Sequence, residues 1–290
     1  MAKGRSGIGK HPMPPKNESQ DSPADEIKHV RPIATELERA KKMLAETREY
    51  SEEMDGKKIS DKDIAILEKE TLKLGKSSNM GIRFSEKDLE KILDSGRFKS
   101  IYETHTSGGT TNEKLREEIE NLSMSYSSDT PVTQRPIYGM LFDYKNVSEV
   151  NVSEGAGSRY NKWAGVVAIM KPEVKRFATV TFGDSLDNDL IPSPLLKPSI
   201  LSYDVYKYRR GPLQKTIEAA KSGTLRLKEL EPSISYAEVQ IHNQQATVKN
   251  IQHLIFSKGA YKKGKVPPNI QKRLKKLGIT WSYEGEDKIH

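Results

Sequence analysis

The hydrophobic periodicity of the chain changes near Gly96, and this change constrains the fold more than any other feature. Before it, apolar residues recur at helical spacing in three segments, 32–53, 60–75 and 85–96. The last two begin with a serine as N-cap and end at a glycine. After Gly96 the chain carries short β-rich runs bounded by proline or glycine. We therefore predict an α+β fold rather than a regular alternation of parallel strands and helices.

The runs after Gly96 predict a series of strands with few helices between them. Residues 98–104 are expected to be extended, whereas 112–124 and 213–220 are expected to be helical. The connection at 170–173 is short, so we expect the strands on either side of it to pair. The predicted inward face of the first helix consists of Leu115, Ile119 and Leu122. The predicted strands are 137–144, 165–170, 177–182, 236–241 and the first part of 246–256.

Composition suggests how the chain is divided. With 290 residues, 34% hydrophobic content and a mean hydropathy of −0.71, the chain can bury one core and leaves part of itself solvated. Residues 1–31, rich in Gly, Lys, Ser and Pro, are expected to form a disordered tail. We predict a helical lobe over 32–96, the main α+β domain over 97–257 and a basic extension over 258–290.

Several classes of site and structure are disfavoured by the residues present. The chain has no cysteine, which excludes disulfides, thiolate metal ligands and a cysteine nucleophile. The six histidines show no metal-ligand spacing, so no metal site is expected. No apolar run approaches the roughly 20 residues that span a bilayer, so no membrane partner is expected. The N-terminus lacks the hydrophobic segment of a cleaved export signal.

The formal net charge of +8 comes largely from the two ends of the chain. The basic residues between 258 and 276 form a run without an acidic residue. A solvated face is the simplest interpretation, and a surface for an acidic protein or a phosphate is the alternative. Aromatic residues are not interleaved with these lysines as stacking platforms, so we do not expect nucleic acid as the partner.

Two glycine-rich segments match nucleotide-binding motifs only in part. Residues 4–10 have Walker-type spacing, but His11 stands where a Ser or Thr would hold magnesium, and no buried strand precedes them. Residues 155–157 lack the preceding strand and the following acidic residue of a dinucleotide fold. We expect neither segment to bind nucleotide phosphates.

The segment 235–242, Ser-Tyr-Ala-Glu-Val-Gln-Ile-His, places an acidic residue on a short strand late in the chain. Alternation puts Glu238 on the face opposite Ala237 and Val239, where it either meets solvent or enters a site. A carboxylate on a rigid strand can stabilise the oxocarbenium-like state that forms when a glycosidic bond breaks. Upstream, arginines and small hydroxyl residues occur in segments 97–109, 135–139 and 176–185.

In this order, the four segments resemble the ADP-ribosyltransferase superfamily, in particular its bacterial effector and toxin-like members. The resemblance covers about residues 97–256, and it implies a core of two small packed β-sheets with flanking helices, preceded by the helical lobe. It also implies that NAD is a substrate and that the main domain is catalytic. Glu238 fits the late catalytic glutamate; alternatively, Gln240 occupies the glutamate position and activity is lost.

The resemblance also assigns NAD-binding roles to residues upstream. An arginine of the first core strand binds NAD in the superfamily; Arg97 fits this role, and Arg135 is a substitute. The hydroxyl strand that supports the pocket corresponds to 179–181 with Ser185, although Val180 stands at its centre. The expected NAD-binding residues are Arg97, Thr104, Arg135, Tyr138, Thr179, Thr181, Ser185 and Gln240.

The implied activity is mono-ADP-ribosyl transfer from NAD to a protein side chain, with release of nicotinamide. Arginine modifiers usually carry a second glutamate two positions before the catalytic one, and Tyr236 at that position favours a hydroxyl acceptor. The layout is similar to that of effectors that ADP-ribosylate ubiquitin on threonine. We therefore expect a monomer acting on a host protein, with ubiquitin as the candidate, in the host cytosol after secretion, or otherwise a cytoplasmic protein.

Two other function classes fit the sequence. A catalytically silent interaction module would keep the fold and bind a partner through the N-terminal helices and the basic C-terminal run. A phage-associated structural or nucleic-acid-binding protein would use the basic run to bind DNA or RNA in a salt-sensitive way.

Overall fold

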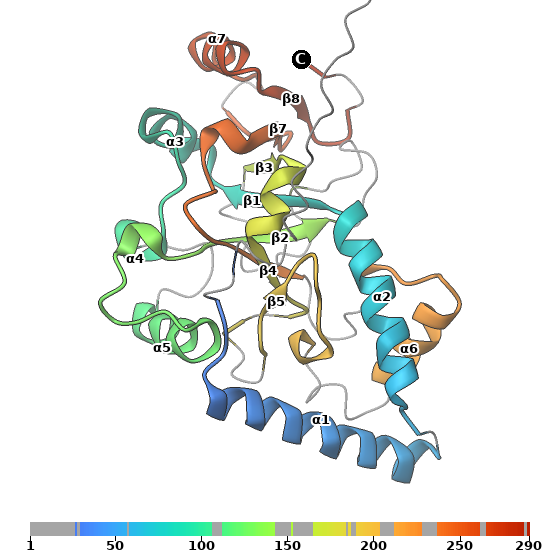
Figure 1. Cartoon of the computed structure of the whole chain (residues 1–290). Coiled ribbons are helices and arrows are strands. Elements are labelled where there is room, and N and C mark those ends of the chain that lie inside the picture. The colour runs from blue at the N-terminus through green and yellow to red at the C-terminus, as the bar shows by residue number, and fades with distance from the viewer. Residues whose placement is uncertain are drawn as a thin grey trace, which may run out of the picture.

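The protein is described by a computed structural model over residues 27, 30–56, 58–105, 112–142, 152, 165–183, 185–186, 190–203, 212–227, 237–261, 265–286 and 289–290. Its strands are β1 (Asn79–Phe84), β2 (Ile137–Phe142), β3 (Val166–Met170), β4 (Ala178–Thr181), β5 (Ser193–Pro194), β6 (Glu238–Ile241), β7 (Ile251–Phe256) and β8 (Thr280–Tyr283). They form one eight-stranded sheet in the order β5-β4-β6-β2-β1-β3-β7-β8, with helices around it (Figure 1).

The predicted α+β class is confirmed, whereas the predicted pair of small packed sheets is wrong. All described strands are joined by hydrogen bonds into a single sheet, in which neighbouring strands are antiparallel except for the parallel pair β7 and β8. The predicted pairing across 170–173 is also wrong. The 3₁₀ helix η5 (Pro172–Phe177) carries the chain from β3, which pairs with β1 and β7, to β4, which pairs with β5 and β6.

The helices are α1 (Ala34–Asp55), α2 (Asp61–Ser77), α3 (Leu89–Ser95), α4 (Ile101–Thr104), α5 (Glu113–Met124), α6 (Pro212–Lys221) and α7 (Pro268–Leu277). Shorter 3₁₀ helices are η2 (Glu86–Asp88), η3 (Val132–Gln134), η6 (Ile200–Ser202) and η9 (Val248–Asn250). Two of the capping signals that predict α2 and α3 are present, whereas the predicted end of α2 at Gly75 is wrong because α2 continues to Ser77. Ser85 caps η2, which leads into α3. Ser60 and Asp63 form a reciprocal capping box, and Gly96 ends α3 in the left-handed conformation with φ 73°.

The segment 32–96 is not a purely helical lobe, because β1 lies inside it. β1 is hydrogen-bonded between β2 and β3 near the middle of the sheet, so this segment is part of the main core. Its six residues lie between two strongly helical patterns, so the strand was not predicted from the sequence. The predicted extended segment 98–104 is also wrong, since Ser100 and Glu103 form a capping box that starts α4.

The segment 258–290, predicted as a basic extension, contributes a helix to the main core and a strand to the sheet. α7 buries Ile270 and Leu274 in the main core, and β8 pairs with β7 at the edge of the sheet. Residues 1–26 lie outside the described residues, so the disordered tail stays a prediction. Ile27 and Val30 are buried against Met124 of α5.

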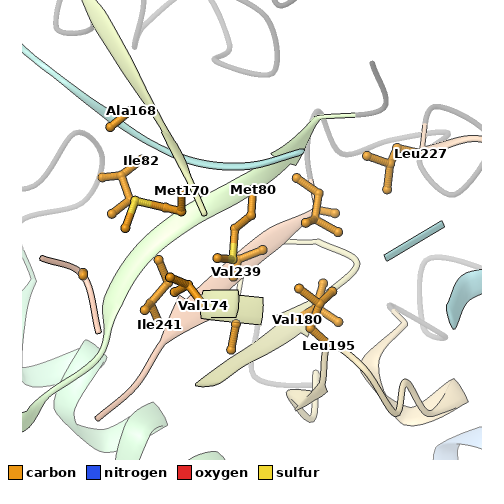
Figure 2. Packing of buried hydrophobic residues seen from close by; sticks show 14 of the residues in the cluster. Met80, Ile82, Ala168, Met170, Val174, Val180, Leu195, Leu227, Val239 and Ile241 are labelled. Carbon is orange, nitrogen blue, oxygen red and sulfur yellow. The ribbon is translucent and has the colours of Figure 1, made fainter. Parts of the chain in front are cut away.

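The main hydrophobic core lies on one face of the sheet. Alternate residues of the strands enter it, including Met80 and Ile82 of β1, Val180 of β4 and Val239 of β6 (Figure 2). Helices α2, α3, α6 and α7 supply the other side, and α2 lies beside α6 (Figure 1). No described helix is long and apolar enough to cross a membrane.

Candidate active site

The other face of the sheet is divided into an apolar and a polar half. Met140, Phe142, Val167, Ile169 and Ile255 form a small apolar cluster with Val152. Beside it, cross-strand register places the polar side chains of β2, β6 and β4 on the same face, because directly opposed residues point the same way. Glu238 lies opposite Thr181 and Met140, and Gln240 lies opposite Thr179 and Tyr138.

Glu238 lies at the centre of the polar half and is 4% exposed, so the alternative of a solvent-facing strand residue is wrong. Its Oε1 accepts a hydrogen bond from the Ser185 hydroxyl and another from Gln240 Nε2 at 3.0 Å. Gln240 Nε2 also donates to Thr181 Oγ1 at 3.2 Å, and Thr181 donates to the Gly183 carbonyl. The strand, its neighbour and the following turn thus hold the carboxylate in one orientation.

Helix α5 covers this polar half with a charged face. Its buried residues include Arg116, Glu120 and Ser123, spaced for one side of a helix. Glu120 Oε1 accepts from the Tyr138 hydroxyl at 2.7 Å, and Glu120 Oε2 accepts from Arg135 Nη1 at 3.0 Å. Burial raises the pKa of Glu120, although these two neighbours favour its charged form.

Arg135 binds α5 and the turn after it rather than an open site. Its guanidinium also donates to Asn121 Oδ1 at 3.2 Å and to the Ser127 carbonyl at 2.7 Å. The rings of Tyr102 and Tyr126 lie 5.2 and 5.5 Å from it. Since these contacts occupy both terminal nitrogens of the guanidinium, we assign Arg135 to holding α5 against the sheet.

Arg116 is the cation with unused hydrogen-bonding capacity at this site. It is 7% exposed, and its guanidinium carbon lies 3.9 Å from the centre of the Tyr138 ring. Burial lowers its pKa, but the neighbouring Tyr138 and the Glu238 carboxylate outweigh burial, so the pKa is raised. Its Nη1 has no hydrogen-bond partner in the described part of the chain. A buried N–H of this kind is costly unless a ligand accepts from it.

The structure brings together most of the residues predicted from separate segments. Thr179, Thr181, Ser185, Glu238 and Gln240 form one hydrogen-bonded group, and Tyr138 joins it through cross-strand register. Arg97 and Thr104 lie in another group. Arg97 makes a two-pronged ion pair with Glu103, and Thr104 Oγ1 donates to the Ser100 carbonyl at 3.1 Å.

Sequence reasoning missed Arg116, Glu120, Tyr126 and His242. The buried face of α5 is turned from the predicted one, because its partner is a polar strand surface rather than an apolar core. His242 could have been found by strand alternation, since it stands two residues after Gln240 on the same side. No periodicity marks Tyr126, which follows the end of the helix.

Two further features concern ligands. A separate cavity of about 380 Å³ lies near the C-terminus, lined by Lys258, Lys265, Gln271, Trp281, Tyr283, Glu286 and His290, and includes no predicted site residue. No group of three or more histidine, aspartate or glutamate side chains in the described ranges is arranged to hold a metal ion.

The chain is similar to a phage protein. The chain is 26% identical over 210 residues to the Gene 2 protein of Mycobacterium phage D29. The aligned part covers 68% of this chain and 70% of the phage protein, whose name states no activity. No protein-family model matches the chain.

Proposed function

We propose that the protein is a mono-ADP-ribosyltransferase that cleaves NAD at the polar half of the sheet, with Glu238 as the catalytic residue. The observation that carries the proposal is the pairing of a fixed carboxylate with a cation that has a spare donor. Glu238 accepts from Ser185 and Gln240, and buried Arg116 beside it has an unpartnered Nη1. The substrate, a dinucleotide diphosphate with a cationic leaving group, needs both charges.

The proposed chemistry follows from these charges. The bond between ribose C1 and nicotinamide breaks, and nicotinamide leaves with the electron pair. The Glu238 carboxylate stabilises the positive charge that develops on the ribose. The oxygen of an acceptor hydroxyl then bonds to the same carbon, and its proton is released to water. Arg116 would hold a phosphate oxygen through its free N–H. Thr179, Thr181 and Ser185 act by fixing Gln240 and Glu238.

Access to Glu238 requires a covering element to move. The carboxylate is buried, and α5 is a described element that covers its face of the sheet through the contacts of Glu120 with Tyr138 and Arg135. A shift of α5 would open the polar half and free the Arg116 guanidinium from the Tyr138 ring. The proposal therefore includes substrate-dependent movement of this helix.

We propose a protein hydroxyl as the acceptor, with ubiquitin as the first candidate. Position 236, where arginine-modifying members of the superfamily carry a second glutamate, is a tyrosine outside the described residues. This proposal places the action on a host protein after secretion, and it needs no second cofactor.

The test is intact-protein mass spectrometry after incubation of the chain with NAD and ubiquitin, and separately with NAD and a eukaryotic lysate. We expect one ADP-ribose mass on an acceptor with the wild type and with Glu173→Gln, whose carboxylate is exposed on η5. With Glu238→Gln no adduct should form on the acceptor, and the variant should keep the wild-type melting temperature. An adduct of equal yield with Glu238→Gln would overturn the assignment.

A second candidate is a phage-associated nucleic-acid-binding protein. The similarity to a phage protein favours it, together with the exposed cations Lys272, Lys275 and Lys276 on α7. On this alternative, DNA or RNA binding weakens steeply with salt, and replacing the three lysines by glutamine abolishes it. Binding that does not respond to the replacement would exclude α7 as the interface.

A further inference from the structure

The hydrogen bonds around Glu238 continue along β6 to a histidine that the proposed chemistry does not use. Thr179 Oγ1 donates to Gln240 Oε1 at 2.7 Å and lies 2.8 Å from His242 Nε2. On the other side of the ring, Nδ1 lies 2.7 Å from the Tyr126 hydroxyl. His242 has no exposed surface, and the Tyr126 ring is stacked near it with a centroid distance of 6.0 Å.

The direction of each hydrogen bond follows from the number of protons available. An ionised carboxylate only accepts, so Gln240 must turn its amide nitrogen toward Glu238 and its oxygen toward Thr179. Thr179 has one hydroxyl proton and donates it to Gln240 Oε1, so its oxygen must accept from His242 Nε2. A neutral imidazole carries one N–H, which leaves Nδ1 to accept from Tyr126.

The opposite direction is excluded while Glu238 is ionised. If Thr179 donated to His242, it would have to accept from the amide of Gln240. The Gln240 oxygen would then face the Glu238 carboxylate, and two acceptors would be held at hydrogen-bond distance. Burial also disfavours a cationic ring, because His242 has no exposed surface and removal from water penalises the charged form.

We propose that His242 is a positioning residue. Held as the neutral Nε2–H tautomer, it directs the hydroxyl of Thr179, which orients the Gln240 amide, which in turn orients the Glu238 carboxylate. The chain of donors runs in one direction, from Tyr126 through His242 to Glu238. The effect of His242 on catalysis rests on the proposed function, whereas the tautomer and the direction of the chain do not.

The first test is ¹⁵N NMR of the histidine rings in the full-length protein. We expect the His242 resonances, assigned by their loss in His242→Gln, to show the Nε2–H tautomer at neutral pH. In Thr179→Val the N–H loses its acceptor, so the Nδ1–H tautomer should gain population. A wild-type ring that is cationic or Nδ1–H, or a Thr179→Val ring that does not change, overturns the proposal.

The second test separates positioning from stability. Glutamine at position 242 can still donate an N–H toward Thr179, whereas leucine cannot. We expect His242→Leu to lower kcat for NAD cleavage about tenfold with little change in KM, and His242→Gln to recover most of the loss. If both variants lose activity equally while their melting temperatures match the wild type, His242 does not position the site.

The two tests also separate the failure of this proposal from failure of the proposed function. If the wild-type protein does not cleave NAD, the proposed function fails and the catalytic role of His242 fails with it. The ring resonances still decide whether the chain of donors exists, because they require no substrate.

Discussion

Arg116 is the residue that we expect to contribute most to the affinity for NAD. A hydrogen bond to a charged group contributes about 1.5–3 kcal/mol, so losing the guanidinium should weaken binding by roughly 10- to 100-fold. We predict that Arg116→Gln raises the KM for NAD by this factor. Arg97→Gln is the control, because Arg97 is used by Glu103, and its KM should stay within about twofold. A raised KM for NAD in Arg97→Gln, with an unchanged KM in Arg116→Gln, would instead assign NAD binding to Arg97.

His253 makes the stability of the fold depend on pH. Its ring is buried between the hydroxyls of Thr280 and Ser282, at 2.7 and 2.9 Å, and burial lowers its pKa to about 4. Between pH 4 and the ordinary histidine pKa of about 6.5, the unfolded chain binds this proton and the folded chain does not. The free energy of unfolding therefore falls as the pH drops through this window, by about 3 kcal/mol in total.

Urea denaturation between pH 4 and 7.5 measures this dependence. We predict that His253→Gln reduces the slope of the free energy of unfolding against pH by the amount that corresponds to about one proton bound on unfolding. An unchanged slope in His253→Gln would contradict the assignment.

At the scale of elements, the contact between β1 and β2 depends on glycine. A Cβ on Gly139 would lie 2.5 Å from the backbone carbonyl oxygen of Gly81, and a backbone atom cannot move aside as a flexible side chain can. We predict that Gly139→Ala destabilises the protein by about 2–3 kcal/mol. Gly259→Ala is the matched control, since its Cβ meets nothing within 4 Å and its effect should stay within about 0.5 kcal/mol. Equal melting temperatures for the two variants would show that β1 and β2 can separate without cost.

Elements with long periodic patterns or clear caps could be predicted from the sequence, and short ones could not. α1, α2, α5 and α6 occur where helical spacing places them. β1 was missed because a six-residue strand shows too few alternations to stand out between two helices. α4 was misread as a strand although Ser100 and Glu103 carry a capping signal.

At the scale of the whole molecule, the C-terminal 33 residues should be necessary for stability. α7 and β8 cover β7, whose Leu254 and Phe256 lie in the main core with Ile270 and Leu274. We predict that a chain ending at residue 257 loses cooperative thermal unfolding or melts at least about 10 °C lower. Deletion of residues 1–26, which belong to the disordered tail predicted over 1–31, should leave the melting temperature unchanged. A chain ending at 257 with the wild-type melting temperature would contradict the core assignment.

The residues of the candidate site could be predicted from the sequence only in part. The resemblance of the four segments, together with residue types and strand alternation, was enough to select Glu238, Thr179, Thr181 and Ser185, which the fold brings together. These signals were not enough to select the cation, because Arg116 comes from a helix whose buried face is polar and has no apolar signal. The order of strands depends on long-range pairing, which local pattern does not encode.

The central claim is that Glu238 cleaves the bond between ribose and nicotinamide. Release of nicotinamide from NAD, followed by chromatography, tests it without knowledge of the acceptor, since water can replace a protein hydroxyl. We predict that the folded wild type and folded Glu173→Gln release nicotinamide, and that folded Glu238→Gln releases it at least about 100-fold more slowly. Absence of release by the folded wild type, or an equal rate in Glu238→Gln, would contradict the account.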